Sequence, residues 1–255
     1  MRSLLQSEQL NKTYNEGKDN QVHVLKNVSL SIEKGEFIAI MGPSGSGKST
    51  LLYNISGMDK MTSGSVKFNG QEIADLTEKE LARLRLHQMG FIFQYHHLIK
   101  NLSIYENIIL PAFLAKRSDE VDINKSAMEL MKKLGIIELA NRDITQASGG
   151  QLQRVAISRA LMNSPDIVFA DEPTGALNSK SAFEVMEILR EINETATTIV
   201  LVTHDVKVAA RTERILYMLD GNLVGEKQLG KYKQENDDLS LRESIISRWL
   251  MERKF

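Results

Sequence analysis

The chain has no cysteine and no long apolar run, and these two absences narrow its class. With 0 Cys among 255 residues, disulfides, thiolate metal sites and cysteine nucleophiles are excluded, which suits a reducing compartment such as the cytoplasm. No stretch reaches the ~18 uninterrupted apolar residues of a membrane span. The first residues also lack the apolar core of a secretory signal. We therefore expect a chain that does not cross a bilayer.

An excess of positive charge is also missing. Lys and Arg number 32 and Asp and Glu number 33, which gives a net charge of -1. No global positive field exists to hold a polyanion, so nucleic acid is disfavoured as a partner. With 42% hydrophobic and 25% charged residues, and only 4 Pro, the composition is that of a globular protein. The length suits one large or two small domains.

The order of the expected elements indicates an α/β fold. Strand patterns occur at 24–32, 36–41, 90–93, 166–170 and 198–203. The capping spacing of Thr77 and Glu80 predicts a helix over 78–86, and Ser103 with Glu106 predicts the start of another. From 95 to 163 no strand pattern appears, and the spacing before Gly135 is helical. Strands that alternate with helices predict a parallel sheet, here with a helical insertion.

Residues 42–49 read GPSGSGKS and match the pattern G-x-x-x-x-G-K-[ST] between a strand and a helix. The glycines let backbone N–H groups surround an anion, and the helix adds its positive end. Lys48 would neutralise the outer phosphates, and the Ser49 hydroxyl would ligate Mg²⁺. The alternative is an ordinary Gly-rich turn. This pattern is expected by chance in only roughly one chain in a hundred of this length, so that alternative is disfavoured. The predicted nucleotide-binding residues are Gly42, Ser44, Gly45, Ser46, Gly47, Lys48, Ser49 and Thr50.

A second candidate site is the acidic pair at the end of the 166–170 strand. Successive strand residues point to opposite sides, so one carboxylate can face a metal ion and the other a water molecule. We predict Asp171 as a Mg²⁺ partner and Glu172 as the base that accepts a proton from the attacking water. A solvated acidic loop is the alternative. It is disfavoured because paired carboxylates at a buried strand end repel unless a cation is near.

The segment ASGGQ at 147–151, followed by Gln153 and Arg154, resembles the signature motif of ATP-binding cassette (ABC) ATPases. The resemblance extends from Tyr14 to about Gly225, with the motifs in the order of that family. It implies the following roles: adenine stacking by Tyr14; catalysis by Glu172, His204 and Lys48; Mg²⁺ binding by Ser49, Gln94 and Asp171; and γ-phosphate contacts from the signature residues Ser148, Gly149, Gly150 and Gln151.

The resemblance also implies an architecture and an assembly. The expected fold is a P-loop NTPase core with a parallel sheet, an antiparallel β subdomain and an inserted ABC-specific helical subdomain. One ABC ATPase domain would cover 1–230, with the core at 1–94 and 164–230 and the helical subdomain at 95–163; 231–255 would be a polar linker and an amphipathic helix. Two chains, or this chain and a related ATPase, would form a head-to-tail dimer around two ATP molecules.

Within the family, the segments at 90–94 and 171–180 look most like bacterial ATPases of the macrolide-exporter, lipoprotein-release and peptide-antibiotic-resistance group. In that group the ATPase docks beneath a membrane permease, which implies peripheral attachment to the cytoplasmic face of the cell membrane. A helical segment at 98–111 would grip the permease, although its apolar residues equally suit a core. The alternatives are an ATPase that transmits force in cell division or signalling without cargo, and a soluble ABC protein acting on nucleic acid or the ribosome.

The C-terminal helix carries an apolar face made of Leu241, Ile245, Ile246, Trp249 and Leu250. We expect this face to pack on the chain's own core, while a dimer contact and a contact with the membrane partner remain alternatives. A membrane-surface anchor would use Arg242, Arg248, Arg253 and Lys254 around Trp249. Glu243 and Glu252 dilute that positive charge.

Two positions depart from the family pattern. Ala147 stands where the family usually has Leu, which should weaken one packing contact. Asn178 stands where the family usually has the Asp that helps to join the two active sites of the dimer. The second departure affects hydrolysis rather than ATP binding.

We predict that Asn178→Asp raises the ATPase turnover of the permease-bound complex and leaves ATP affinity nearly unchanged. A hydrogen bond to a charged acceptor is roughly twice as strong as one to a neutral acceptor, and small displacements of catalytic groups cost large rate factors. Steady-state ATPase rates in reconstituted membranes test this. A slower Asp variant would contradict it and would mean that the loop is adapted to Asn.

Overall fold

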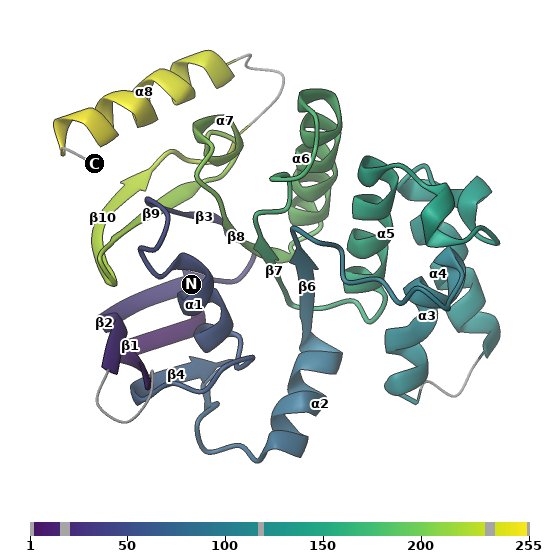
Figure 1. The fold of residues 1–255 in the computed structure, drawn as a ribbon, viewed down its shortest axis with the longest axis horizontal. Coiled ribbons are helices and arrows are strands. Elements are labelled where there is room, and N and C mark those ends of the chain that lie inside the picture. The colour runs from purple at the N-terminus through teal and green to yellow at the C-terminus, as the bar shows by residue number, and fades with distance from the viewer. Residues whose placement is uncertain (1–2, 16–20, 117–119, 233–237, 254–255) are drawn as a thin grey trace. The chain divides into compact units, whose positions relative to one another are not determined.

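The computed structural model describes residues 3–15, 21–116, 120–232 and 238–253 and divides into two compact units (Figure 1). The first unit comprises Met1–Thr77 and Asn193–Phe255, and the second comprises Glu78–Ile192. The boundaries expected from the family, after residues 94, 163 and 230, stay a prediction.

The first unit contains an antiparallel sheet in the order β2-β1-β4-β5. Its strands are β1 (Ser3–Asn15), β2 (Gln21–Glu33), β4 (Ser63–Phe68) and β5 (Gln71–Glu72). The strand predicted at 24–32 lies in β2. Sequence patterning missed β1, because the register shifts on both sides of Leu10 interrupt the period of two that marks a strand. Gly64 is required where β1 and β4 meet, since a Cβ there would lie 2.4 Å from the Gln9 carbonyl oxygen.

The other paired strands of this unit include β3, which leads into the P-loop, residues 42–49. Strand β3 (Phe37–Met41) pairs in parallel with β8 (Thr198–Val202) and with β9 (Arg214–Leu219), and β10 (Asn222–Gln228) pairs with β9 in antiparallel fashion. Every residue of β3 and β8 is buried, as expected of parallel strands covered on both faces. The strands predicted at 36–41 and 198–203 are confirmed.

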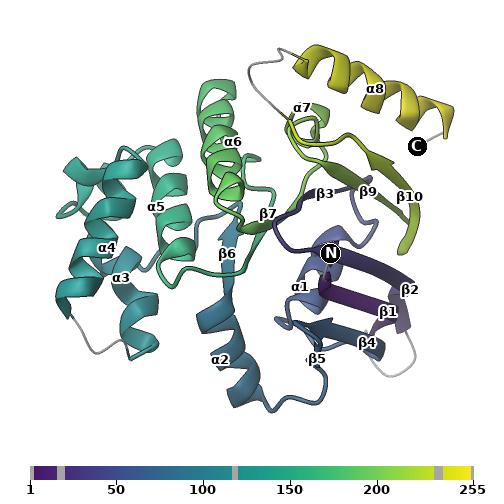
Figure 2. The same ribbon diagram turned by 180° about the vertical axis from the view of Figure 1, so that it is seen from behind.

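Three helices complete the first unit. Helix α1 (Lys48–Ile55) follows β3, and α7 (Val206–Ala209) follows β8. Helix α8 (Leu239–Glu252) lies beside α7 and the β9–β10 hairpin in both views (Figures 1 and 2).

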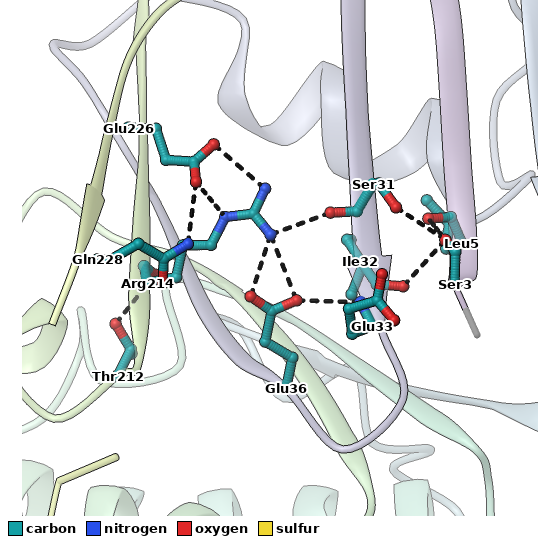
Figure 3. Close-up of polar contacts among 10 residues, drawn as sticks. All are labelled: Ser3, Leu5, Ser31, Ile32, Glu33, Glu36, Thr212, Arg214, Glu226 and Gln228. Carbon is teal, nitrogen blue, oxygen red and sulfur yellow. Dashed lines mark hydrogen bonds and ion pairs between the residues drawn. The ribbon is translucent and has the colours of Figure 1, made fainter. Parts of the chain in front are cut away.

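Arg214 joins the two sheets of this unit (Figure 3). Its Nη1 atom lies 3.0 Å from Glu36 Oε1 and donates to the carbonyl oxygen of Ser31 on β2 at 3.1 Å, and its Nε lies 3.1 Å from Glu226 Oε1 on β10. The Arg214 and Glu36 side chains are only 11% and 12% exposed. Because little water screens the pair, the attraction between the two charges is stronger than in a surface ion pair, and the cost of removing both charges from water offsets part of it.

The second unit pairs β6 (Met89–Phe93) with β7 (Ile167–Asp171) in parallel. Its helices are α2 (Glu78–Gln88), α3 (Ile104–Leu114), α4 (Glu120–Lys133), α5 (Gly149–Leu161) and α6 (Ser179–Glu194), with short 3₁₀ turns at Ile137–Leu139 and Ile144–Gln146. Helices α3, α4 and α5 pack together (Figure 2). Apart from the segment at 98–111, the predicted helices and strands of this stretch are confirmed, and Ser103 and Glu106 form the expected capping box at the start of α3.

The helix expected over 98–111 is partly wrong. Residues 98–103 form a loop, and α3 begins at Ile104. The buried side chain of Asn107 explains the loop: its Nδ2 donates to the carbonyl oxygens of Ile99, Leu102 and Ser103 at 3.1, 3.2 and 3.0 Å, and its Oδ1 accepts from the Ile99 N–H at 2.8 Å. A side-chain amide therefore supplies the hydrogen bonds that a helix would otherwise supply.

The C-terminal helix matches its predicted apolar face at Ile246 and Trp249, which are 0% and 7% exposed. Leu241 does not belong to this face, since it is 63% exposed. Arg242 is buried instead, so it is not available for the surface anchor considered above, and Lys254 lies outside the described residues. No helix in the described part of the chain combines the length and the apolar character needed to cross a membrane.

We predict that Asn107→Ala lowers the free energy of unfolding by about 1–3 kcal/mol, because partly buried backbone groups of the 99–103 loop lose a hydrogen-bond partner. Thermal and urea unfolding of the purified chain measure this. Asn101→Ala removes an exposed amide from the same loop and serves as the control with no change. Equal stability of the two variants would contradict the role given to Asn107.

Candidate functional site

The P-loop leaves the buried strand β3 through a backbone that only glycine fits. A Cβ on Gly42 (φ +151°) would lie 2.2 Å from the Met218 carbonyl oxygen, and Gly47 precedes α1 with φ +95°. Gly45 has φ +79°, and no atom lies within 4 Å of where its Cβ would stand. The loop is thus fixed on β9 at its start and open around Gly45.

The residues of this loop fit a phosphate group. Helix α1 begins without a side-chain cap and without an acidic residue in its first turn, so its N-terminal N–H groups favour an anion. The Ser46 hydroxyl oxygen is buried and has no hydrogen-bond partner among the residues that the structure describes. Lys48 is 8% exposed, and its Nζ donates to the Pro43 carbonyl oxygen at 2.8 Å. The Ser46 hydroxyl can therefore form a hydrogen bond to a phosphate oxygen held in this loop.

Tyr14 lies beside the P-loop helix. Its hydroxyl donates to Asp59 Oδ2 at 2.5 Å, and Thr50 on α1 also hydrogen-bonds to it. The Nζ of Lys12 lies 4.5 Å from the Tyr14 ring centre and 2.7 Å from Asp59 Oδ1. Burial, and then the neighbouring Asp59 carboxylate, raise the pKa of Tyr14 to about 12. Tyr14 is 39% exposed. The hydrogen bonds of its hydroxyl hold the ring in one orientation.

His204 stands at the same sheet edge as the P-loop. The register of β3 and β8 pairs Ile40 with Val202, and the Thr203 N–H donates to the Ile40 carbonyl oxygen at 3.1 Å. His204 is exposed and directly precedes Asp205, which caps α7. The first unit thus brings together the P-loop, Tyr14 and His204.

In the second unit, Gln94 and the acidic pair share one sheet edge. Phe93 pairs with Asp171, so Gln94 and Glu172 both follow the ends of adjacent strands. The Nε2 of Gln94 lies 3.0 Å from where a Cβ of Gly175 would stand. Glu172 has a φ of +47°, which costs a non-glycine residue roughly 1–2 kcal/mol. This backbone conformation turns the chain sharply directly after β7, where the carboxylate of the predicted general base stands.

The signature residues open helix α5. Ser148 is the N-cap, its Oγ accepts from the Gln151 N–H at 3.4 Å, and Gln151 Oε1 accepts from the Ser148 N–H at 2.9 Å. The side chain of Gln151 therefore forms part of the capping box at the start of α5. Ser148 and Gly149 are exposed, so the start of α5 is accessible to solvent. A Cβ on Gly150 would lie 2.8 Å from Ser181 Oγ, so glycine allows α5 to approach α6.

Sequence reasoning singled out Asn178 but missed its capping contact, and it missed Asp59 and Arg159 altogether. Asn178 caps α6, because its Oδ1 accepts from the Ser181 N–H at 2.9 Å; its spacing from Ser181 is the available sequence signal. Asp59 holds Tyr14 across 45 positions, and Arg159 donates to the carbonyl oxygens of His96 and His97, each at 2.7 Å. No local pattern signals the latter two contacts.

Known proteins match this fold and these motifs. Residues 25–175 match the ABC transporter family. The chain is 46% identical to the macrolide export ATP-binding/permease protein MacB of Aggregatibacter actinomycetemcomitans over 91% of its own length, but it spans only 36% of that protein. It is 42% identical to the lipoprotein-releasing system ATP-binding protein LolD 1 of Rhodopseudomonas palustris over 88% of its length and spans 100% of that protein.

Solved structures of ATP-binding cassettes also match this chain. The ATP-binding cassette MJ0796, a dimer in a post-hydrolysis state bound to ADP and Pi, matches with a TM-score of 0.83 and 42% identity over 89% of this chain and 100% of that chain. CbiO1 of Clostridium perfringens, part of an ABC transporter complex, matches with a TM-score of 0.81 and 29% identity over 99% of this chain and 96% of that chain. The expected fold class and the resemblance read from the motifs are both confirmed. The chain is therefore a member of the ABC transporter family and an ABC-type ATPase.

Proposed function

We propose that this chain is the energy-supplying subunit of a bacterial ABC transporter, which dimerises around two ATP molecules and drives a membrane permease. The observation that carries the proposal is the P-loop: an open loop at Gly45, an uncapped α1 and a buried, unpaired Ser46 hydroxyl. These features suit the β- and γ-phosphates of a nucleotide. Lys48 neutralises the charge of those phosphates, and the exposed ring of Tyr14 stacks on the adenine.

Magnesium binding follows from the chemistry of three side chains. Ser49, Gln94 and Asp171 supply a hydroxyl, an amide and a carboxylate oxygen, which are donors that Mg²⁺ prefers. Bound Mg²⁺ would neutralise charge on the phosphate oxygens. Glu172 then takes the proton of the attacking water, and His204 orients the γ-phosphate.

A head-to-tail dimer explains why the exposed start of α5 carries the signature residues. Ser148 accepts a hydrogen bond from within its own helix, which leaves its hydroxyl proton to donate to a γ-phosphate on the second chain. The N–H groups of Gly149 and Gly150 add the positive end of α5. The dimeric state of MJ0796 with ADP and Pi supports this assembly.

A permease surface is suggested by the apolar side chains that follow Gln94 and end α3. Tyr95, Ile99, Phe113 and Leu114 are 73%, 44%, 51% and 62% exposed, and exposed apolar residues of this kind mark interaction sites. We place the chain at the cytoplasmic face of the cell membrane, held there by this contact. The similarity to MacB and LolD 1 favours export or extraction of a macrolide or a lipoprotein, and the resemblance of the segments at 90–94 and 171–180 adds a peptide antibiotic as a third candidate cargo.

Purification of the chain from its native membrane, followed by identification of the attached protein, tests the proposal. An associated permease with stimulated ATPase activity is the expected result. A permease partner whose loss stops cell division or signalling and moves no cargo would instead support the force-transmitting alternative. Co-purification with ribosomes or nucleic acid alone would contradict the proposal.

We predict that Glu172→Gln keeps ATP binding and lowers turnover by about 10²–10⁴-fold, the usual contribution of a general base. Loss of a negative charge near the γ-phosphate also favours the closed dimer. ATPase assays and size-exclusion chromatography with MgATP measure both effects, with Glu129→Gln on α4, an exposed residue, as the control. Unchanged hydrolysis and no additional dimer would mean that Glu172 has another role.

We predict that Tyr14→Ala weakens ATP binding by about 5- to 150-fold, which corresponds to the ~1–3 kcal/mol of one base–aromatic stack. Binding of inorganic triphosphate should not change, because it has no base. Equilibrium binding of both ligands is the measurement, and Tyr95→Ala, which removes an exposed tyrosine of the second unit, is the control. An equal loss for ATP and triphosphate would identify Tyr14 as a structural residue.

A further inference from the structure

The segment that follows His204 is short and is held at two points. Its first point is Thr203, whose N–H donates to the Ile40 carbonyl oxygen on β3 at 3.1 Å. Helix α7 then makes a single turn, Val206–Ala209, capped by Asp205. A one-turn helix has little stability of its own. The contacts at the far end of α7 therefore bear on the position of His204. Two of them are made within the turn and to β3: the Thr212 hydroxyl donates to the Ala209 carbonyl oxygen at 2.8 Å, and the Glu213 N–H donates to the Phe37 carbonyl oxygen at 2.7 Å.

The far end of α7 is also held by Arg242 of α8. The Nε of Arg242 donates to the Ala210 carbonyl oxygen at 2.7 Å, and its Nη2 donates to the Thr212 carbonyl oxygen at 2.7 Å. Both carbonyls belong to the turn that leaves α7. One planar guanidinium thus fixes two peptide groups of this turn, in the forked geometry that only arginine offers.

The same guanidinium also binds the segment that leads to α8. It donates to the carbonyl oxygens of Leu229 and Gly230 at 3.0 and 2.9 Å, and Asp238 Oδ2 lies 4.0 Å from Nη1. Arg242 is only 4% exposed. A charge buried this deeply is tolerated when its donors are satisfied, and here backbone carbonyls from two segments satisfy them.

Helix α8 is itself fixed to the sheet that carries the P-loop. Trp249 meets Tyr217 edge to face, with ring centres 6.0 Å apart, and Tyr217 on β9 pairs with Met41 at the end of β3. Ile246 is fully buried beside them on the same helix face. The helix that carries Arg242 is therefore anchored beside β3, the strand that precedes the P-loop.

We propose that Arg242 is a positioning residue for His204: by fixing the end of α7 to α8, it sets where His204 stands relative to the P-loop. This inference rests on the proposed role of His204 in hydrolysis. It assigns a part in the ATPase cycle to a helix that lies beyond the stretch from Tyr14 to Gly225 in which the family motifs occur. The competing role for Arg242 is stability of the fold alone.

The test is a double-mutant cycle between Arg242→Gln and His204→Ala, carried out on the full-length chain in its permease-bound complex. We expect Arg242→Gln to lower kcat by about 10- to 100-fold with little change in KM for ATP, because small displacements of a catalytic group have effects of this size. In the His204→Ala background the same substitution should have no further effect on kcat. Arg248→Gln, an exposed arginine of the same helix, is the matched control and should leave kcat unchanged.

Hydrogen exchange supplies a second measurement that does not depend on catalysis. Arg242→Gln should speed amide exchange at 205–212 and leave the amides of α1 at their wild-type rates. If Arg242→Gln does not fold, Arg242→Lys replaces it in every assay, since a lysine keeps the charge and part of the hydrogen bonding; an intermediate loss of kcat is then expected.

The possible failures are distinguishable. If His204→Ala hydrolyses ATP at the wild-type rate, the proposed function of His204 fails, and the inference fails with it. If His204→Ala is slow but Arg242→Gln has normal kcat, or lowers kcat by the same factor in both backgrounds, the inference alone is overturned and Arg242 serves stability only.

Discussion

The backbone hydrogen bonds of β3 are the interaction on which the candidate site of the first unit depends. This strand is fully buried and pairs in parallel with β8 on one side and β9 on the other. Parallel strands end at the same edge of a sheet. The pairing that buries the five apolar residues of β3 therefore also places the start of the P-loop, His204 and the turn after β9 at one edge. The close approach of Gly42 to the Met218 carbonyl oxygen is a direct result of this pairing.

In the second unit, the parallel pairing of β6 with β7 likewise places candidate site residues at one edge of a sheet. The pairing of Phe93 with Asp171 places Gln94 and Glu172 at one edge. The helices of this unit are attached to each other by polar side chains: Arg154 on α5 binds Glu184 on α6 at 2.7 Å, and its other nitrogen donates to the Leu134 carbonyl oxygen at 3.0 Å. Such contacts fix the direction of α5, and with it the direction of its exposed start.

Sequence patterns identified the parts of the site that are local in the chain. The P-loop, the acidic pair and the capping box at Ser103 each lie within a few consecutive residues, and their physical requirements are visible in the residue types. Strand β1 was missed because its bulges break the alternation of apolar and polar residues. The burial of Arg242 was also missed, because charge and helical spacing predict an exposed arginine, whereas its carbonyl partners lie 12 to 32 positions earlier.

The contact between Gly150 and Ser181 has a mechanical consequence. Asn178 caps α6 through the Ser181 N–H, and the Ser181 hydroxyl occupies the space in which a side chain of residue 150 would stand. Close-packed groups of this kind cannot slide past each other without opening a void or a clash. We therefore expect the loop after Glu172 and the first turn of α5 to move as one rigid piece, so that a shift at Glu172 is carried within the same chain to the exposed start of α5.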